Sequence, residues 1–162
     1  MLATDPGASL SAIATQAGVD RRTVYRRFAS REALLTAIYQ ARLDAVEEAV
    51  ATARLREAPV AVALHRYVES IIAVNRKWPV ELTRMRAEGS IRNRRTRMIE
   101  EVDAFLERAT EEGLLRRDIP KGWTSSLLPE LMHLASRQLP DSSAAQAADL
   151  VVDTLLNGVG RE

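Results

Sequence analysis

Hydrophobic residues recur along most of the chain at the three- and four-residue spacing of an amphipathic α-helix, and no segment alternates as a β-strand does. Prolines and glycines interrupt this pattern at intervals that suit the ends of helices. The spacing predicts helices over eight ranges: about 9–16, 20–28, 30–55, 59–76, 79–88, 93–112, 121–138 and 142–157. The predicted fold class is therefore all-α.

The first two predicted helices carry the signals of a helix-turn-helix. Ser9 can cap the first helix and Asp20 the second, because their side-chain oxygens accept hydrogen bonds from free backbone N–H groups. Gly18 stands where a left-handed residue must end the first helix. Val19 can fill the angle between the two helices. Ser30 is then placed to cap the long third helix.

Positive charge gathers at this unit, although the net charge of the chain is only +1. Arginines at the N-terminus of a second helix can read guanine in the major groove, and other cations can reach phosphates. A second basic run, residues 92–97, could also contact nucleic acid, but the start of a solvated helix is the favoured interpretation. Five arginines lie between Asp20 and Glu32: Arg21, Arg22, Arg26, Arg27 and Arg31.

Composition excludes several other classes of site. The chain has no cysteine, which removes disulfides, thiolate metal sites and cysteine nucleophiles. His65 and His133 do not have the spacing of metal ligands, so we expect no metal and no cofactor. No catalytic motif or membrane-spanning run is present, and the first residues are unlike a signal peptide. We therefore expect a cytoplasmic protein that is not an enzyme.

The segment from Ser9 to Tyr39 resembles the DNA-binding signature of the TetR (tetracycline-repressor-like) family. This resemblance implies two domains: a helix-turn-helix DNA-binding domain at residues 1–39 and a helical effector-binding and dimerisation domain at residues 40–162. The positions that carry the resemblance are Ile13, Ala14, Ala17, Gly18, Val19, Thr23, Val24, Tyr25, Phe28, Ser30, Arg31, Glu32, Ala33, Leu34 and Leu35.

The family pattern implies particular roles at the DNA. Base reading falls mainly to Arg21, Arg22 and Arg26, while Ser9 and Ser11 approach DNA from the supporting helix. Tyr25 can pack through its ring and contact DNA through its hydroxyl. The residues implied to contact phosphates are Thr23, Tyr25, Arg27 and Arg31.

One departure concerns the start of the unit. The family has a further helix before it, of which this sequence carries only the tail, residues 1–4. Either the sequence begins late, or the head is shortened and binds DNA more weakly. In the second case we expect four apolar side chains to lose cover: Leu10, Ile13, Phe28 and Leu35.

The last two predicted helices resemble the dimer-forming helices of the family, which pair with their copies in a four-helix interface. Two-fold symmetry would present two heads to a palindromic operator in double-stranded DNA. Packing inside one protomer is the alternative. The apolar residues in question are Leu128, Leu131, Met132, Ala135 and Leu139, with Ala148, Val151, Val152, Leu155, Leu156 and Val159 in the final helix.

The resemblance also implies a pocket for an unknown small-molecule effector, although each candidate residue also suits an ordinary core. Polar contacts could come from Arg84, Arg86 and Glu88, for which solvated surface is the stronger interpretation. The candidate wall residues are Leu64, Tyr67, Val68, Ile71, Trp78, Met85, Phe105, Trp123 and Met132.

The predicted function is that of a DNA-binding transcription regulator, a repressor released from a palindromic operator by a small effector. The effector must favour a geometry in which the two heads no longer match the operator. The alternative function is a helical dimerising or ligand-binding module whose head does not bind DNA specifically.

Overall fold

The computed structural model of the protein describes residues 7–78 and 89–159. The described part is built of helices joined by turns, which confirms the predicted all-α fold. The helices are α1 (Leu10–Gln16), α2 (Arg21–Arg27), α3 (Arg31–Ala53), α4 (Val60–Lys77), α5 (Gly89–Glu111), α6 (Trp123–Gln138) and α7 (Ala144–Val159).

Most helix ends lie within a few residues of their predicted positions, because caps and turn residues mark them. α5 begins at Gly89, about one turn before the predicted start at residue 93. The helix predicted over 79–88 lies outside the described residues. The predicted boundary between the two domains, after residue 39, falls inside α3, which continues across it.

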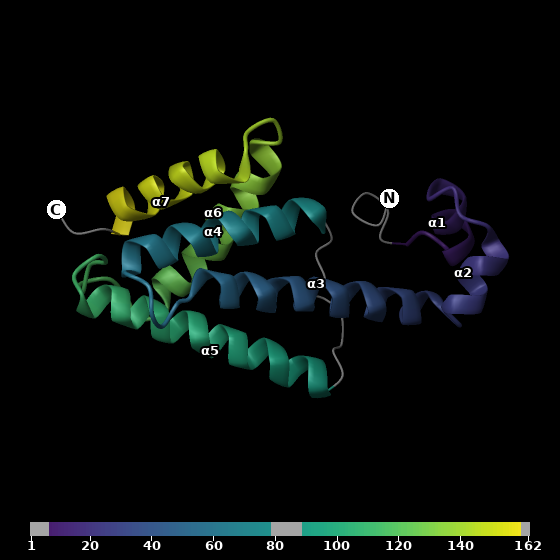
Figure 1. The fold of residues 1–162 in the computed structure, drawn as a ribbon, viewed down its shortest axis with the longest axis horizontal. Helices are drawn as coiled ribbons and strands as arrows, with labels where there is room; N and C mark the ends of the chain where they lie inside the picture. Colours follow the sequence, from purple (N-terminus) through teal and green to yellow (C-terminus); the bar gives the residue numbers. More distant parts are fainter. Residues whose placement is uncertain (1–6, 79–88, 160–162) are drawn as a thin grey trace.

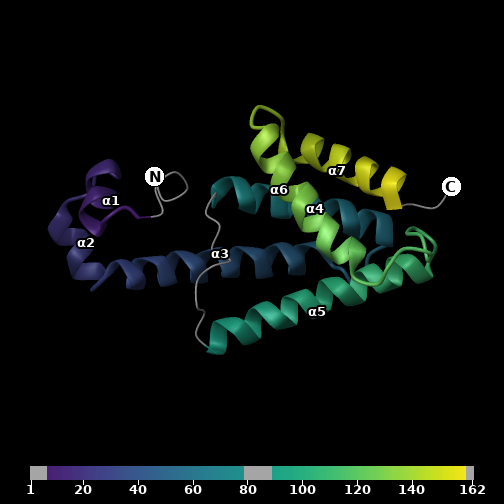
Figure 2. The same cartoon turned by 180° about the vertical axis from the view of Figure 1, so that it is seen from behind.

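The molecule is elongated, with a small head at one end of α3 and a larger body around its other half (Figure 1). The head is formed by α1 and α2, which pack against each other. In the body, α4 contacts α3, α5, α6 and α7, so it is the central helix. Figure 2 shows from behind that α6 crosses α4, and that the head stays apart from α4–α7.

The core of the body surrounds α4. Its buried side chains come from α3, α4, α5, α6 and α7 and from the turns between them, so it is one continuous cluster. A smaller cluster of Tyr39, Leu43 and Ile91 joins the middle of α3 to the start of α5. The largest side chains with almost no exposed surface are Leu55, Leu64, Val68, Ile72, Leu115, Leu128, Met132 and Leu155.

Arginine side chains fasten two of the helix junctions. Backbone carbonyls in the turns between helices need hydrogen-bond donors from outside the helical pattern. Arg108 of α5 donates to the Leu55 carbonyl (2.7 Å) and the Ala58 carbonyl (2.9 Å) after the end of α3. Arg76 of α4 donates to the carbonyls of Leu139 (2.7 Å) and Ser142 (2.8 Å) between α6 and α7.

Candidate nucleic-acid interface

The predicted caps of α1 and α2 are present. The Ser9 hydroxyl oxygen accepts a hydrogen bond from the Ala12 N–H (3.1 Å). The Asp20 carboxylate accepts from the N–H groups of Arg22 (2.8 Å) and Thr23 (3.3 Å). Because α2 has only seven residues, these bonds hold a large share of its backbone in helical form.

The turn between α1 and α2 is also formed as expected, except at one residue. Gly18 has φ +64°, the left-handed conformation that lacks a steric penalty only for glycine. The Val19 N–H donates to the carbonyl of Ala14, which is fully buried. Val19 itself does not fill the angle between the helices, because its side chain points outward and is 42% exposed.

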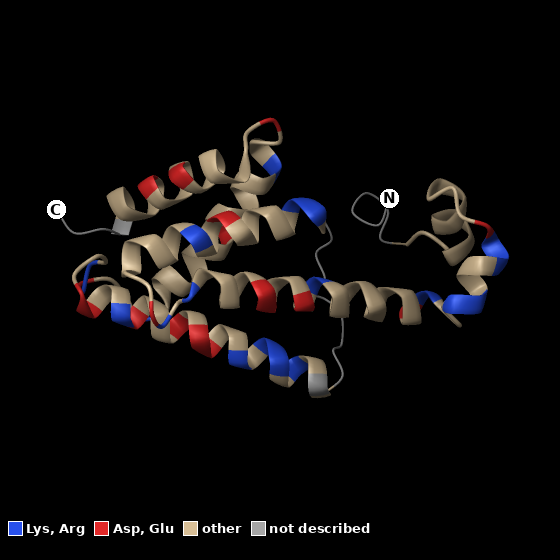
Figure 3. Ribbon diagram, in the orientation of Figure 1, with Lys and Arg blue, Asp and Glu red and all other residues tan. Residues whose placement is uncertain are grey.

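The predicted DNA-reading face of α2 is exposed. No residue of α2 is buried, and half of the Tyr25 surface is accessible. Within residues 7–78 and 89–159, none of the observed ion pairs engages an arginine of this helix. Figure 3 shows these cations at the far end of the head. The predicted α2 residues that share this exposure are Arg21, Arg22, Thr23, Tyr25, Arg26 and Arg27.

Three of the predicted DNA contacts also have roles inside the head. The Arg31 Nε donates to the Ala8 carbonyl (3.0 Å), which ties the start of α3 to the segment before α1. The Ser9 hydroxyl serves as a cap, and Ser11 is half-buried with its carbonyl accepting from the Thr15 hydroxyl (3.0 Å). Their contacts with DNA stay predictions.

The apolar side of the head is partly covered. Leu10 is buried, whereas Ile13, Phe28 and Leu35 are half-buried. The Arg27 guanidinium lies 5.9 Å from the centre of the Phe28 ring, a cation–π arrangement that covers part of the ring. Cover by the described residues is therefore strongest at the start of α1.

Comparison with known proteins agrees with this geometry. Residues 6–38 match the family model described as bacterial regulatory proteins, tetR family. The TetR-like transcriptional regulator LfrR from Mycobacterium smegmatis, solved in complex with proflavine, is 28% identical with a TM-score of 0.73. That alignment covers 98% of this chain and 89% of LfrR. The head therefore matches a model of the TetR family, and the chain has the fold of TetR-like transcriptional regulators.

More distant relatives support the same fold. The ketosteroid transcriptional regulator KstR2 of Mycobacterium tuberculosis has a TM-score of 0.82 at 18% identity, over 100% of this chain and 90% of KstR2. The TetR family regulator PfmR from Thermus thermophilus has a TM-score of 0.71 at 21% identity, over 96% of this chain and 91% of PfmR. No curated protein sequence matches the chain.

The structure brings most of the expected effector-pocket residues together around α4, but not all of them. Trp78 is half-buried beside them, and Met85 lies outside the described residues. Trp123 is 54% exposed, so its placement in a pocket wall was wrong; as the first residue of α6 it faces away from the core. Those buried in the core are Leu64, Tyr67, Val68, Ile71, Phe105 and Met132.

Two polar groups lie buried in this part of the structure. The indole Nε1 of Trp78 is buried and has no acceptor among the described residues. Burial raises the pKa of Tyr67 to about 12, and the negative charge of Asp103 adds to this effect. The Tyr67 phenol therefore stays neutral at physiological pH, and both groups can act as hydrogen-bond donors.

An open depression of about 680 Å³ lies elsewhere, on α5. It contains none of the residues expected to bind an effector. Among the described residues, no group of histidine, aspartate and glutamate side chains could hold a metal ion. No helix in the same residues is long and apolar enough to cross a membrane. The residues that line the depression are Asn93, Arg94, Thr96, Arg97 and Glu100.

The apolar residues expected at the dimer face need a correction. The faces of α6 and α7 that carry the strongest apolar stripes pack inside the protomer, because α4 lies against both helices. Among the side chains of α6 and α7 that the structure describes, the large apolar ones that are exposed are instead Trp123, Leu134 and Leu150. Those assigned to a dimer from sequence but buried in this core are Leu128, Met132, Ala135, Ala148, Val151 and Leu155, with Leu131, Leu139, Val152 and Leu156 partly buried against it.

Proposed function

We propose that this chain is a TetR-family regulator, a homodimeric repressor that binds a palindromic operator through α2. The observation that carries the proposal is the exposed face of α2, whose arginines are free of ion pairs with the described residues. Elsewhere in the chain many arginines are engaged with carboxylates or backbone carbonyls. A row of cations without ion pairs to the described residues, on a short, capped helix, suits a polyanionic partner.

The chemistry of the face divides into two tasks. Arg21, Arg22 and Arg26 carry planar guanidinium groups that can donate two hydrogen bonds to guanine O6 and N7. Thr23 and the Tyr25 hydroxyl, with Arg27, suit phosphate oxygens, which fix the register of the head without reading sequence. Ser9, Ser11 and Arg31 are proposed to add contacts beside α2.

The proposed dimer pairs α6 and α7 with their copies. Trp123, Leu134 and Leu150 supply the apolar surface, since each is more than half exposed in the single chain. α6 and α7 are neighbours, so these side chains can contribute to one face. A two-fold axis through that face would carry two heads to two half-sites of an operator.

The proposed effector is a small molecule that binds beside α4. LfrR is solved in complex with proflavine, which shows that a related fold holds a small molecule. In this chain, Tyr67 and Trp78 offer polar donors among apolar side chains, as small-molecule sites require. The proposal places the protein in the cytoplasm, with its operator, and assigns it no catalytic step.

Selection of binding sites from a random duplex pool tests the proposal, followed by affinity measurements with Arg22→Ala and Arg66→Ala. Arg66 is an exposed arginine of α4, so its removal changes the net charge equally. We expect a palindromic winner, and a loss of about 1–3 kcal/mol in binding for Arg22→Ala because a bidentate base contact disappears. Arg66→Ala should bind as the unchanged protein does.

Equal losses for the two variants would identify a non-specific cationic surface, whose affinity falls with salt on every duplex. If no sequence is enriched, the repressor proposal fails and the helical binding module remains as the function of the chain.

A further inference from the structure

The head is attached to the body through α3. The main contacts of α1 and α2 are with each other, whereas α3 packs on α4 and α5. Figures 1 and 2 show the first half of α3 extending from the body with the head at its tip. The direction of α3 relative to the body therefore sets the position of the head.

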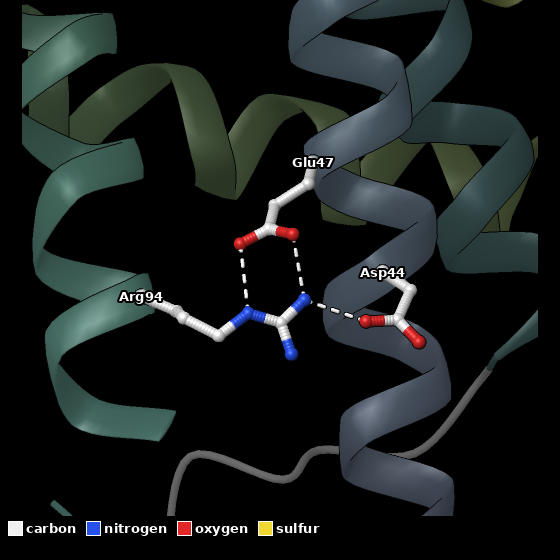
Figure 4. Close-up of polar contacts among 3 residues, drawn as sticks. All are labelled: Asp44, Glu47 and Arg94. Carbon is white, nitrogen blue, oxygen red and sulfur yellow. Dashed lines mark hydrogen bonds and ion pairs between the residues drawn. The ribbon is translucent and has the colours of Figure 1, made fainter. Parts of the chain in front are cut away.

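A clamp of three charged residues fixes α3 against α5 (Figure 4). Arg94 of α5 donates from Nε to Glu47 Oε1 (2.9 Å) and from Nη2 to Glu47 Oε2 (2.6 Å). Its Nη2 also donates to Asp44 Oδ1 (2.5 Å). Asp44 and Glu47 lie one turn apart on α3, so a single guanidinium holds two points of this helix.

The electrostatics of the clamp favour the charged pair. The hydrogen bond from Arg94 is the main cause that lowers the pKa of Glu47, and the bonds to Glu47 and Asp44 raise the pKa of Arg94. The pair is only partly buried, so a modest contribution to overall stability is expected. Its two-pronged geometry restricts orientation more than a single contact does.

The clamp lies in the second half of α3, so a small change in the tilt of α3 there displaces the head at its other end. Glu47 lies sixteen positions after Arg31, about 24 Å along a helix, and Tyr39, which also packs on the start of α5, lies eight positions after it, about 12 Å. A tilt of α3 by about 5° at these contacts therefore moves its first turn by about 1–2 Å. Two heads on one duplex must match half-sites set by the helical repeat of DNA. If α3 can tilt relative to the body, the dimer therefore accepts a wider range of distances between half-sites.

We propose that Arg94 is a positioning residue for DNA binding: by holding Glu47 and Asp44, it fixes the tilt of α3 and so the half-site spacing that the dimer accepts. This inference rests on the proposed dimeric DNA-binding function. Arg94 does not contact DNA in this scheme. It acts only through the direction of α3.

The first test compares Arg94→Ala, Arg94→Lys and the matched control Arg92→Ala on duplexes whose half-sites differ in spacing by single base pairs. Arg92 is an exposed arginine of the same helix with no ion pair to another described residue. The unchanged protein and Arg92→Ala should prefer one spacing. In Arg94→Ala the ratio of affinities between the best and the neighbouring spacings should fall toward one. Arg94→Lys should give an intermediate ratio, because an ammonium group cannot form the two parallel hydrogen bonds that the guanidinium makes with Glu47.

The second test needs neither an operator nor a dimer. The natural chain lacks cysteine, so spin labels can be placed at Gln16→Cys in the head and Ala73→Cys in the body, both exposed. Labelled chains are diluted with unlabelled chains, and the distance distribution is measured by electron spin resonance. Arg94→Ala should broaden the distribution, whereas Arg92→Ala should not.

The two tests separate failure of this inference from failure of the proposed function. An unbroadened distance distribution in Arg94→Ala, or an unchanged spacing preference, overturns the positioning role. A lower melting temperature alone would show only a structural role and would also count against it. If the unchanged protein selects no duplex, the dimeric repressor fails, while the distance measurement still decides whether Arg94 fixes α3.

Discussion

At the scale of single residues, arginine has two opposite roles in this chain. Arg76, Arg94 and Arg108 turn inward and bind carbonyls or carboxylates of neighbouring helices. Arg21 and Arg22 turn outward from α2. The sequence predicted the outward group correctly, because caps and a glycine surround it. It did not reveal the inward group, since their partners are 47 to 66 residues away along the chain.

Asp20 is the residue on which the start of α2 depends most directly. Replacing it with alanine removes the acceptor for the N–H groups of Arg22 and Thr23, so we expect a loss of about 0.5–2 kcal/mol in stability. Operator affinity should fall as well, because the first turn of α2 frays. Asp20→Asn keeps a capping oxygen and should lose much less in both. Urea unfolding and a duplex titration measure the two effects, and equal behaviour of the variants would contradict this role.

At the scale of helices, the hydrophobic periodicity predicted where each helix lies in the sequence better than it predicted which other helix packs against its apolar face. Caps located the starts of α1, α2 and α3 closely, because they depend on residues two or three apart. The apolar faces of α6 and α7 were equally visible, but a stripe does not say which helix covers it. α4 covers both here, so Met132 and Leu155 belong to the core. For the same reason Trp123 and Val19 were predicted to be covered by other residues, whereas both are exposed.

The contact between α3 and α5 has a pH dependence that one substitution can isolate. Arg94 holds the pKa of Glu47 below its ordinary value of 4.5, so the bond stabilises the folded state above about pH 4.5 and is lost as pH falls through the lowered pKa. Glu47→Gln should melt below the unchanged protein at pH 7, and the gap should close under acidic conditions. Glu48→Gln, at an exposed neighbouring position, is the control. If the difference in melting temperature between Glu47→Gln and the unchanged protein stays constant with pH, the ionised Glu47–Arg94 bond is not its cause.

At the scale of the whole molecule, the exposed face of α6 and α7 is proposed to bring two elongated protomers together. Leu134 and Leu150 are exposed in the single chain, so Leu134→Glu combined with Leu150→Glu should leave the protomer folded and place charge in the interface. Sedimentation velocity should show a monomer, with weaker operator binding. Ile99→Glu changes a similarly exposed side chain on α5 and should remain dimeric. A dimer in the double variant would assign the interface to another surface.

The two tryptophans occupy opposite surroundings, and this gives the protein two intrinsic optical probes. Trp78 has its indole nitrogen buried beside the proposed effector site, whereas Trp123 is 54% exposed on the proposed dimer face. A buried indole emits at shorter wavelength than a solvated one, because water relaxes around the excited ring. The blue side of the emission band thus reports on the interior, and the red side on the proposed dimer face. Ligand binding and assembly can then be followed separately in the unlabelled chain.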